Sequence, residues 1–389
     1  MTGFARRFKH SMNIALPNGL RRRSNAMNHS LGIMTLTPQV TNGYFLEIAK
    51  QSVSYPIDLY LFSPRGISPL SETVEGFHYN RVTGEWEKEA FDIPEYIYDR
   101  TYYQKDLHSR QARAVVQWLK NQKHIRFLGY GLPDKWHLYE KLRHTSLAPY
   151  IPETHLVKSG NHLLNLLTEH TDIIIKPVDG AHGFAVYHLT LLPHGILVRT
   201  TKKQGVIEQS FPGEDVFLKW SERILRQHTF ICQKRLLNLT KGDAPFDLRV
   251  LLNKDGSGEW REFQRATRVG EEKGILTNIS RGATYHSYSD WKRTGNSISW
   301  DFIEEELTTI LEEIPILLEE HFSPLFEIGV DLIISQDHSL WILDMNSKPG
   351  HKVVETLHPE KLSPLYKAPL DYCDFLFSQS LSSLRRGDF

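Results

Sequence analysis

Residues 326–350 read FEIGVDLIISQDHSLWILDMNSKPG, and this stretch decides the fold. The run 329–334 is aliphatic and β-branched, the run 340–343 is apolar again, and the polar residues between them are turn formers. This pattern predicts two strands joined by a tight turn. Each strand carries one acid among apolar neighbours, Asp331 and Asp344. A buried carboxylate is costly unless it is paired with a cation or bound to a metal.

Asn346 follows the second acid at a spacing of two residues. Two carboxylates on adjacent strands and an amide form an all-oxygen set of the kind that Mg²⁺ prefers. Either acid alone is equally compatible with a strand-end residue in water or in a salt bridge. The set of three favours a metal site made of Asp331, Asp344 and Asn346.

The composition is that of an ordinary globular protein. A chain of 389 residues is too long for one small core, so two or three subdomains are expected. Lys+Arg and Asp+Glu number 46 each, so no global field attracts nucleic acid or an anionic membrane. Cys232 and Cys373 are far apart, which fits a reducing compartment such as the cytoplasm. No apolar run approaches the roughly 18 residues that a membrane span needs.

The N-terminal residues 1–30 contain six basic residues and no acid. They lack a long apolar segment, so a secretory signal is not expected. We interpret them as a disordered basic leader, or as sequence upstream of a true start at Met27.

Residues 31–131 are predicted to form a small α/β domain. Strand, helix and strand follow one another at the start, which indicates a parallel sheet. The expected strands are 31–36, 57–62, 74–79, 84–89, 94–99 and 126–129, and the expected helices are 43–54 and 111–121. The polar and aromatic stretch 98–103 fits either the lining of a substrate cleft or plain surface, and the surface interpretation is favoured.

A buried-type strand at 171–177 carries Lys176 near its end and is preceded by helices at 132–142 and 161–170. Pro133 and Asp134 suit the first turn of the former helix. The loop after the strand contains Gly180, His182 and Gly183, whose backbone N–H groups could cradle phosphate oxygens. A plain glycine hairpin is the commoner explanation of such a loop, which is not a Walker A loop.

Arginines concentrate in a predicted hairpin with strands 247–253 and 259–269 around a turn at 253–256. Guanidinium groups suit carboxylate and phosphate oxygens. The arginines are Arg249, Arg265 and Arg268, whereas Arg261 is expected on a solvated strand face.

The remaining pattern predicts packing elements. Strands are expected at 196–199, 205–209 and 229–236, and helices at 215–227, 300–321 and 369–384. Val216 is expected in the apolar stripe of the first of these helices and Phe302 in that of the second, which Pro315 should kink.

The order and spacing of these motifs resemble the ATP-grasp superfamily, and within it the YheC/YheD-type family of endospore coat-associated proteins. The resemblance covers roughly residues 130–355. It implies an α+β ATP-grasp domain over 132–358, with nucleotide between two subdomains. A pre-ATP-grasp-like α/β domain would precede it at 31–131, and a C-terminal helix and tail would follow at 359–389.

The resemblance also implies roles for particular residues. Lys135 and Lys176 would contact nucleotide phosphates, and the loop with Gly180, His182 and Gly183 would close over them. Adenine would be bound by Gln233, Lys234, Arg235 and Leu236, and Asp247 and Arg249 would belong to an Asp-x-Arg strand. Arg268, Asn278 and Arg281 would be catalytic. Asp331, Asp344 and Asn346 would bind Mg²⁺. The chain departs from the family pattern in having Asp344 where Glu is more usual and Ala283 in place of a second glycine.

The implied function is an ATP-dependent carboxylate–amine ligase that works through an acyl phosphate, linked to spore formation. ATP and Mg²⁺, for which Mn²⁺ can substitute, would be the cofactors, and the carboxylate and amine stay unidentified. A cytoplasmic or coat-associated location and coat proteins as partners are expected, without nucleic acid or membrane. Two alternatives stay open: a coat component that binds nucleotide without ligation, and a kinase-like member that phosphorylates without ligation.

Overall fold

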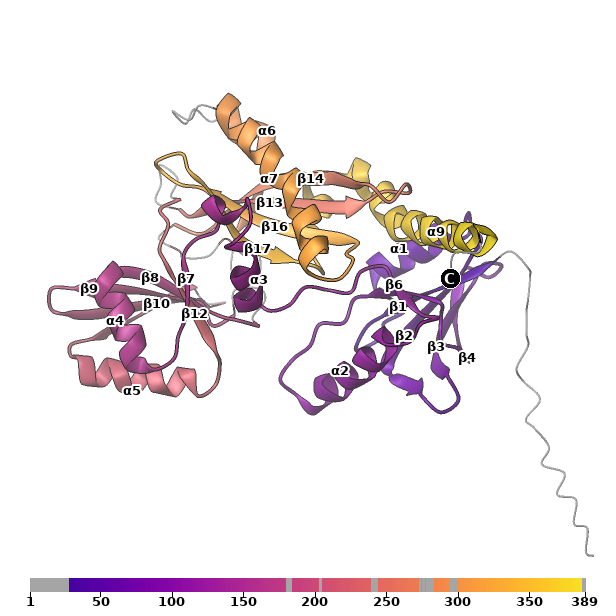
Figure 1. Ribbon diagram of the computed structural model, residues 1–389, viewed down its shortest axis with the longest axis horizontal. Coiled ribbons are helices and arrows are strands. Elements are labelled where there is room, and N and C mark those ends of the chain that lie inside the picture. Colours follow the sequence, from indigo (N-terminus) through magenta and orange to yellow (C-terminus); the bar gives the residue numbers. More distant parts are fainter. Residues whose placement is uncertain are drawn as a thin grey trace, which may run out of the picture.

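The computed structural model describes residues 28–179, 184–202, 205–238, 244–272, 274, 277, 283–293 and 300–386, and its described strands form three sheets. The N-terminal sheet and the second sheet lie at opposite ends of the molecule, and the third sheet lies between them (Figure 1). Helices and sheets alternate along the chain, which is the mixed α/β architecture that the sequence predicted.

The N-terminal sheet has six strands: β1 His29–Met34, β2 Ile57–Ser68, β3 Thr73–Asn80, β4 Glu85–Asp92, β5 Tyr96–Asp99 and β6 Arg126–Phe127. Their order is β4-β3-β2-β1-β5-β6. Strands β2, β1, β5 and β6 are mutually parallel, and β3 and β4 add an antiparallel hairpin, as expected. The helices are α1 Gly43–Ser52 and α2 Leu107–Lys120, and each packs apolar side chains into a separate core cluster of this sheet.

The second sheet carries the predicted lysine strand. Its strands are β7 Thr154–Leu156, β8 Asp172–Pro177, β9 Tyr187–Leu192, β10 Gly195–Lys202, β11 Gly205–Phe211 and β12 Phe230–Lys234, in the order β11-β10-β9-β8-β12-β7. Helices α4 Gly160–His170 and α5 Glu214–Leu225 supply its core residues Leu163, Leu167, Phe217 and Trp220. Helix α3 Lys135–Leu142 and the short helix η1 Ala148–Tyr150 precede the sheet.

The third sheet contains the hairpins predicted at 247–269 and 329–343. Its strands are β13 Phe246–Lys254, β14 Trp260–Val269, β15 Thr284–Ser287, β16 Glu327–Ile334 and β17 Leu340–Asn346, in the order β15-β14-β13-β16-β17. Helix α7 Trp300–His321 buries Ile303, Leu307, Ile310 and Ile314 against one face of this sheet. The short helices α6 Tyr288–Arg293, α8 Lys352–Leu357 and η3 Pro359–Lys361 lie around it.

The last helix, α9 Leu362–Arg386, returns to the N-terminal sheet, where it packs beside α1 (Figure 1). Leu370 and Cys373 are fully buried in the same core cluster as Leu31 of β1. The Tyr55 hydroxyl donates to Asp371 Oδ1 at 2.5 Å and ties this helix to the segment after α1.

Four local predictions are wrong. The stretch 98–103 was expected at the surface, but Asp99, Arg100 and Thr101 are buried. Their partners are Glu327 of β16 and, in the segment after β17, Lys348 and Pro349. Pro133 precedes α3 instead of lying in its first turn, since Asp134 is the N-cap. Val216 and Phe302 are half exposed because each lies one position off the buried stripe of its helix.

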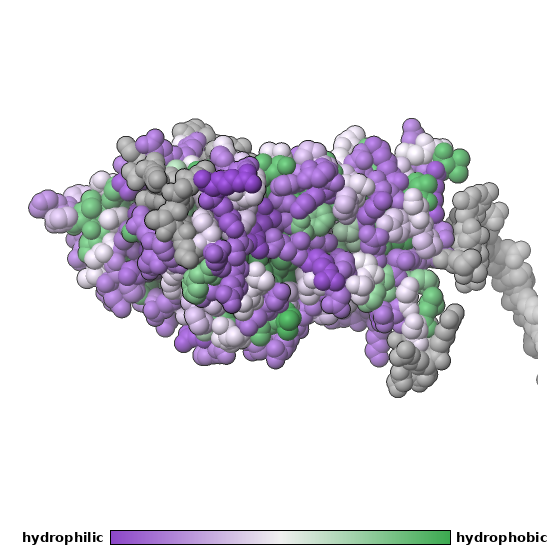
Figure 2. Space-filling model, turned by 90° about the horizontal axis from the view of Figure 1, so that it is seen from above, coloured by the Kyte–Doolittle hydropathy of each residue, from purple (hydrophilic) through white to green (hydrophobic). Residues whose placement is uncertain are grey.

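No helix among the described residues is long and apolar enough to cross a membrane. On the face seen in Figure 2, hydrophilic residues predominate, and hydrophobic residues occur in small separate groups. This face therefore presents no extended apolar patch.

Candidate functional site

The β16–β17 hairpin places the three predicted metal ligands next to one another. Asp331 and Asp344 are direct cross-strand neighbours, and Asn346 is opposite Gly329. The Asn346 amide Nδ2 donates to Asp344 Oδ2 at 3.2 Å, and the Met345 N–H donates to Asp344 Oδ1 at 3.1 Å. These contacts fix the orientation of the Asp344 carboxylate.

Two lysines from other elements reach this hairpin. Lys135 Nζ forms an ion pair with Asp344 Oδ1, and Lys176 Nζ donates to the carbonyl oxygen of Leu343 at 2.9 Å. Asp134 caps α3 by accepting from the N–H groups of the following turn, so Lys135 starts the helix in a fixed place. The Lys135 N–H also donates to the Val178 carbonyl at 3.1 Å, which joins α3 to the end of the lysine strand.

Lys176 is half-buried, close enough to both aspartates to feel their charges. Burial lowers its pKa to about 8, and the positive charge of Lys135 acts in the same direction. Asp344 and Asp331 oppose this effect on the Lys176 pKa. A half-buried ammonium with such a pKa is stabilised by any further negative charge, and phosphate oxygens supply that charge.

A second network surrounds Asp331. Arg249 Nη1 lies 2.6 Å from Asp331 Oδ1 and Arg268 Nη2 lies 3.0 Å from the same oxygen. Burial by itself would raise the pKa of Asp331, but Arg249 and Arg268 outweigh it and lower that pKa to about 2. Asp331 therefore stays ionised over the physiological pH range.

Arg268 also makes a bidentate pair with Asp247 on the neighbouring strand. Its Nε and Nη2 lie 2.7 and 2.6 Å from the two carboxylate oxygens, and Thr277 Oγ1 donates to Asp247 Oδ2. Such a fork fixes the plane of the guanidinium group. Thr277, which the sequence did not single out, belongs to this network.

Gly329 allows Arg249 to lie flat on the hairpin. A Cβ atom at this position would come within 2.7 Å of Arg249 Nη2 and 2.8 Å of Pro349 Cβ. The close approach of a guanidinium group explains why a glycine interrupts an otherwise β-branched strand.

One arginine of the predicted cluster, Arg265, lies elsewhere, and Arg261 lies where it was expected. Arg265 pairs with Glu262 and Glu304 and does not take part in the contacts around Asp331. The Arg261 side chain is 64% exposed, as expected for a solvated face.

The predicted adenine segment leaves the second sheet and turns towards the third. The Gln233 amide donates to Thr154 Oγ1 at 2.8 Å, and Arg235 Nη1 lies 3.3 Å from Asp172 Oδ2. The Leu237 carbonyl, just beyond Lys234 and Leu236, accepts from the Gln336 N–H at 3.0 Å. The side chains of Gln233 and Arg235 are thus engaged within the protein, and that of Lys234 is exposed.

Five predicted site residues lie outside the described residues. They are Gly180, His182, Gly183, Asn278 and Arg281.

The sequence missed a buried anchor for the segment that follows Asn346. Arg100 forms an ion pair with Glu327 and donates to the Pro349 carbonyl at 2.8 Å. His351 Nε2 lies 3.0 Å from Glu327 Oε2, and Lys348 Nζ lies 2.7 Å from Asp99 Oδ2. The end of β5 therefore holds residues 347–351 in place. The one signal for it was the charged and aromatic character of 98–103, directly after a parallel strand.

The donor chemistry fits a magnesium ion. No group of three or more His, Cys, Asp or Glu side chains suited to a metal occurs among the described residues, so the set depends on the Asn346 amide. Because Nδ2 of Asn346 faces Asp344, its carbonyl oxygen is the atom left for a cation. Positive groups already lie against both carboxylates, with both arginine contacts on Oδ1 of Asp331. Hard oxygen donors of this kind suit Mg²⁺ or Mn²⁺.

Comparisons with known proteins agree with this geometry. A family model described as YheC/D like ATP-grasp matches residues 124–376. The endospore coat-associated protein YheC of Bacillus subtilis (strain 168) is 34% identical over 351 residues, covering 90% of this chain and 96% of the relative. The endospore coat-associated protein YheD of the same strain is 23% identical over 329 residues, covering 83% of this chain and 72% of the relative.

A solved structure supports the fold. The crystal structure of D-cycloserine synthetase DcsG matches with a TM-score of 0.51 and 12% identity, covering 88% of this chain and 99% of the other. At this identity the likeness concerns the fold alone, and it confirms the predicted α+β ATP-grasp architecture. Because the family model and YheC each match most of the chain, the protein belongs to the YheC/D-like ATP-grasp family.

Proposed function

We propose that the protein is an ATP-dependent ligase that joins a carboxylate to an amine through an acyl phosphate. One observation carries the proposal: Lys135 and Lys176, from two different elements, converge on Leu343 and Asp344 of the β16–β17 hairpin. Phosphoryl transfer needs positioned positive charge more than it needs covalent chemistry from the protein. Membership of the ATP-grasp family supports the assignment.

In the proposed reaction an oxygen of the substrate carboxylate attacks the γ-phosphorus of ATP, and ADP leaves. The amine then attacks the acyl carbon, loses a proton, and displaces inorganic phosphate. Lys135 and Lys176 would bind the phosphate oxygens, because their ammonium groups lie at Asp344 and at the Leu343 carbonyl. Arg249 and Arg268 are engaged with Asp331 instead. Lys135 would exchange its contact with Asp344 for one with phosphate.

Asp331, Asp344 and Asn346 would hold the magnesium ion. When bound, that ion supplies positive charge that neutralises the phosphate oxygens during transfer. Arg249 and Arg268 keep Asp331 ionised and oriented, as its pKa of about 2 reflects.

Arg268 is proposed to stabilise negative charge on the transferred group and on the tetrahedral oxyanion, together with Asn278 and Arg281. Its fork with Asp247 holds the guanidinium group rigidly, which costs no reorganisation when charge develops. The segment Gln233–Leu236 is proposed to bind adenine through backbone groups.

The test measures ADP release and amide formation with Mg-ATP and a panel of acid and amine pairs. Lys176→Met and Asp344→Ala are each expected to lower turnover by about 100-fold or more, by analogy with the removal of one transition-state contact. Arg261→Gln removes an exposed charge outside the site and serves as the matched control. Equal turnover of Asp344→Ala and the unaltered protein would exclude this site.

The two relatives are named as endospore coat-associated proteins, which raises a second candidate, a coat-associated protein that binds nucleotide without ligation. Calorimetric titration with ADP and Mg²⁺, read together with the ADP-release assay, separates the two functions. Tight binding without ADP release over the whole panel supports the second. For either function we propose an association with the spore coat, which fractionation of spores would test.

A further inference from the structure

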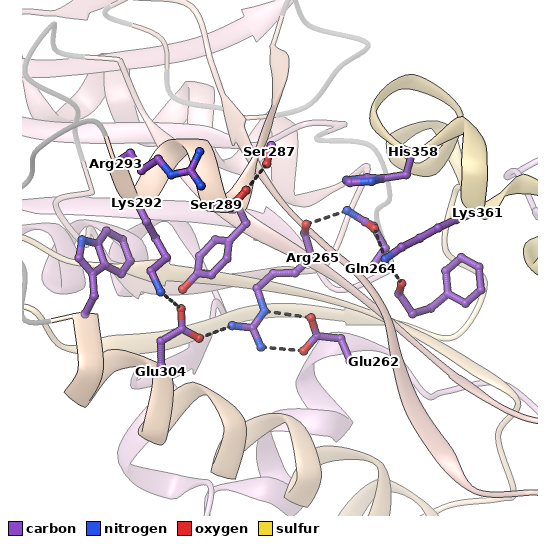
Figure 3. Close-up of a pocket in the computed structure, with 13 residues that line it drawn as sticks. Glu262, Gln264, Arg265, Ser287, Ser289, Lys292, Arg293, Glu304, His358 and Lys361 are labelled. Atoms are coloured by element: carbon purple, nitrogen blue, oxygen red, sulfur yellow. Dashed lines mark hydrogen bonds and ion pairs between the residues drawn. The ribbon is translucent and has the colours of Figure 1, made fainter.

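A cavity lies at the open edge of the third sheet, apart from the proposed ligase site. It has a volume of about 810 Å³ and is lined by residues of β14, α6, α7 and η3 (Figure 3). Strand β15 pairs only with residues 266–269, so residues 260–265 of β14 stay at the edge of the sheet beside this cavity. We call it the basic pocket, with Arg265, Lys292, Arg293, Lys361, Glu262 and Glu304 as its charged side chains together with His358.

The acids of the basic pocket are already neutralised. Glu262 receives two hydrogen bonds from Arg265, at 3.0 and 2.7 Å, and Glu304 receives one from Arg265 at 2.8 Å and one from Lys292 at 2.6 Å. Among the residues that line the pocket, four cationic side chains against these two acids leave two positive charges, without His358. Two acids lie just outside the lining, Asp290, which pairs with Arg293, and Glu360, which pairs with His358. The pocket therefore favours an anion over a neutral or cationic ligand.

The surplus donors lie at two separate ends. Figure 3 shows Lys292 and Arg293 at one side of Arg265, and Lys361 and His358 at the other. Arg293 is 79% exposed and makes one ion pair, at 3.3 Å, with Asp290. Lys361 Nζ donates to the Phe263 carbonyl and to Gln264 Oε1, both at 3.0 Å, which leaves one of its three N–H groups for a ligand.

The middle of the pocket is polar on one side and aromatic on the other. The hydroxyl groups of Ser287 and Ser289 lie 2.8 Å apart and can donate to a ligand. Arg265 lies 5.0 Å from the ring centre of Tyr288, and Lys292 Nζ lies 5.6 Å from that of Trp300. These aromatic rings hold the cationic groups in place and form an apolar wall.

We propose that the basic pocket binds an elongated dianion, a molecule with a carboxylate or phosphate group near each end. One end pairs with Arg293 and Lys292, the other with Lys361 and His358, and the body lies between the serine hydroxyls and the aromatic wall. Arg265 is three residues from Arg268 on the opposite face of β14, which corresponds to about 10 Å along the strand. The ligand is thus held beside the proposed phosphoryl-transfer site without occupying it.

The first test uses matched small anions and the protein labelled with 5-fluorotryptophan, in which Trp300 reports from the pocket wall. The dianions are glutarate and propane-1,3-bisphosphonate, and the monoanions are butyrate and propylphosphonate, all at equal ionic strength. A Trp300→Phe variant identifies the fluorine resonance. A saturable shift is expected with a dianion, at an affinity about tenfold or more above that of its monoanion. The dianion that binds more tightly identifies the head group.

The second test uses charge variants. Arg293→Gln and Lys361→Met are each expected to weaken the dianion by about tenfold, since each removes one charged hydrogen-bond donor. Lys361→Arg should restore binding, which a folding defect would not explain. Arg261→Gln removes a positive charge from the same strand outside the pocket and should leave the affinity unchanged.

Three results would each overturn the proposal. The first is the absence of any difference between dianions and monoanions in the fluorine shift. The second is an equal loss of dianion affinity in Arg261→Gln and Arg293→Gln. The third is displacement of the dianion by Mg-ATP. Displacement by nucleotide would mean that the anion occupies the ATP site.

Discussion

Lys176 donates a hydrogen bond of 2.9 Å to the carbonyl oxygen of Leu343, the residue just before Asp344. This bond joins the end of β8 in the second sheet to β17 in the third, over 167 residues of sequence. A lysine and a candidate metal ligand are thereby held on facing sheets, which is the arrangement that a bound triphosphate requires.

Replacement of Lys176 by methionine should change how stability depends on pH. The pKa of Lys176 is lowered by burial from its ordinary value of 10.5 to about 8, so the unfolded chain binds this proton more tightly than the folded chain. Lys176 should therefore contribute a rise in the free energy of unfolding with pH between about 8 and 10.5, and Lys176→Met should remove that contribution. Urea denaturation at several pH values measures it. The same slope in both proteins would contradict the assigned pKa.

Replacement of Arg100 by methionine should destabilise the fold strongly. It leaves Glu327 buried without its cation and removes the hydrogen bond to the Pro349 carbonyl. A loss of about 3–5 kcal/mol in the free energy of unfolding is expected for one partner of a buried ion pair. Chemical denaturation measures the loss, with Arg261→Gln as the exposed control. A loss equal to that of the control would mean that the pair does not form.

A Gly329→Ala variant should disturb the arginine network through sterics alone. Its Cβ would come within 2.7 Å of Arg249 Nη2, so the guanidinium group must move away from Asp331. A loss of about 1–3 kcal/mol in the free energy of unfolding is expected for such overpacking. Combined with Arg249→Met, the substitution should cost less than the sum of the two single variants, because the guanidinium group is then gone. Pro349 Cβ, at 2.8 Å from the added Cβ, keeps part of the loss in place. Additive losses would contradict this explanation.

The two thiols should be inert in the folded protein. Cys232 and Cys373 are fully buried. Burial raises the pKa of Cys232 to about 12, and it also raises the pKa of Cys373. Because the thiolate is the reactive form, modification by a disulfide reagent should proceed only as fast as the protein opens. Reaction rates with and without urea measure this. Rapid reaction of either thiol in buffer would place it at the surface.

The sequence predicted the elements whose signals are local. The hairpins around residues 253–259 and 335–339 could be predicted because strict strand patterns flank residues that favour turns. The position of Lys176 at a strand end followed from the same kind of pattern, and its nearness to Asp344 followed only from the resemblance to a family. The exposure of Val216 and Phe302 could not be read from residue type, because a helix has more apolar residues than its buried stripe accommodates.

The anchor made by Arg100 could not be predicted from local sequence. Its partners Glu327 and Pro349 are 227 and 249 residues further along the chain, and nothing near Arg100 indicates either of them. The opposite error occurred with Arg265, which was grouped with Arg249 and Arg268 because all three lie in one hairpin. Strand alternation turns it to the other face, where Glu304 of α7 pairs with it.

The packing of α9 against α1 and β1 has a consequence for synthesis of the protein. The N-terminal sheet emerges first from the ribosome, but its core lacks Leu370 and Cys373 until almost the whole chain has been translated. Its hydrophobic surface therefore stays open throughout translation, when chaperones can bind it. A nascent chain truncated before residue 362 should remain sensitive to protease in its first hundred residues, and completion of α9 should bring protection to both ends together.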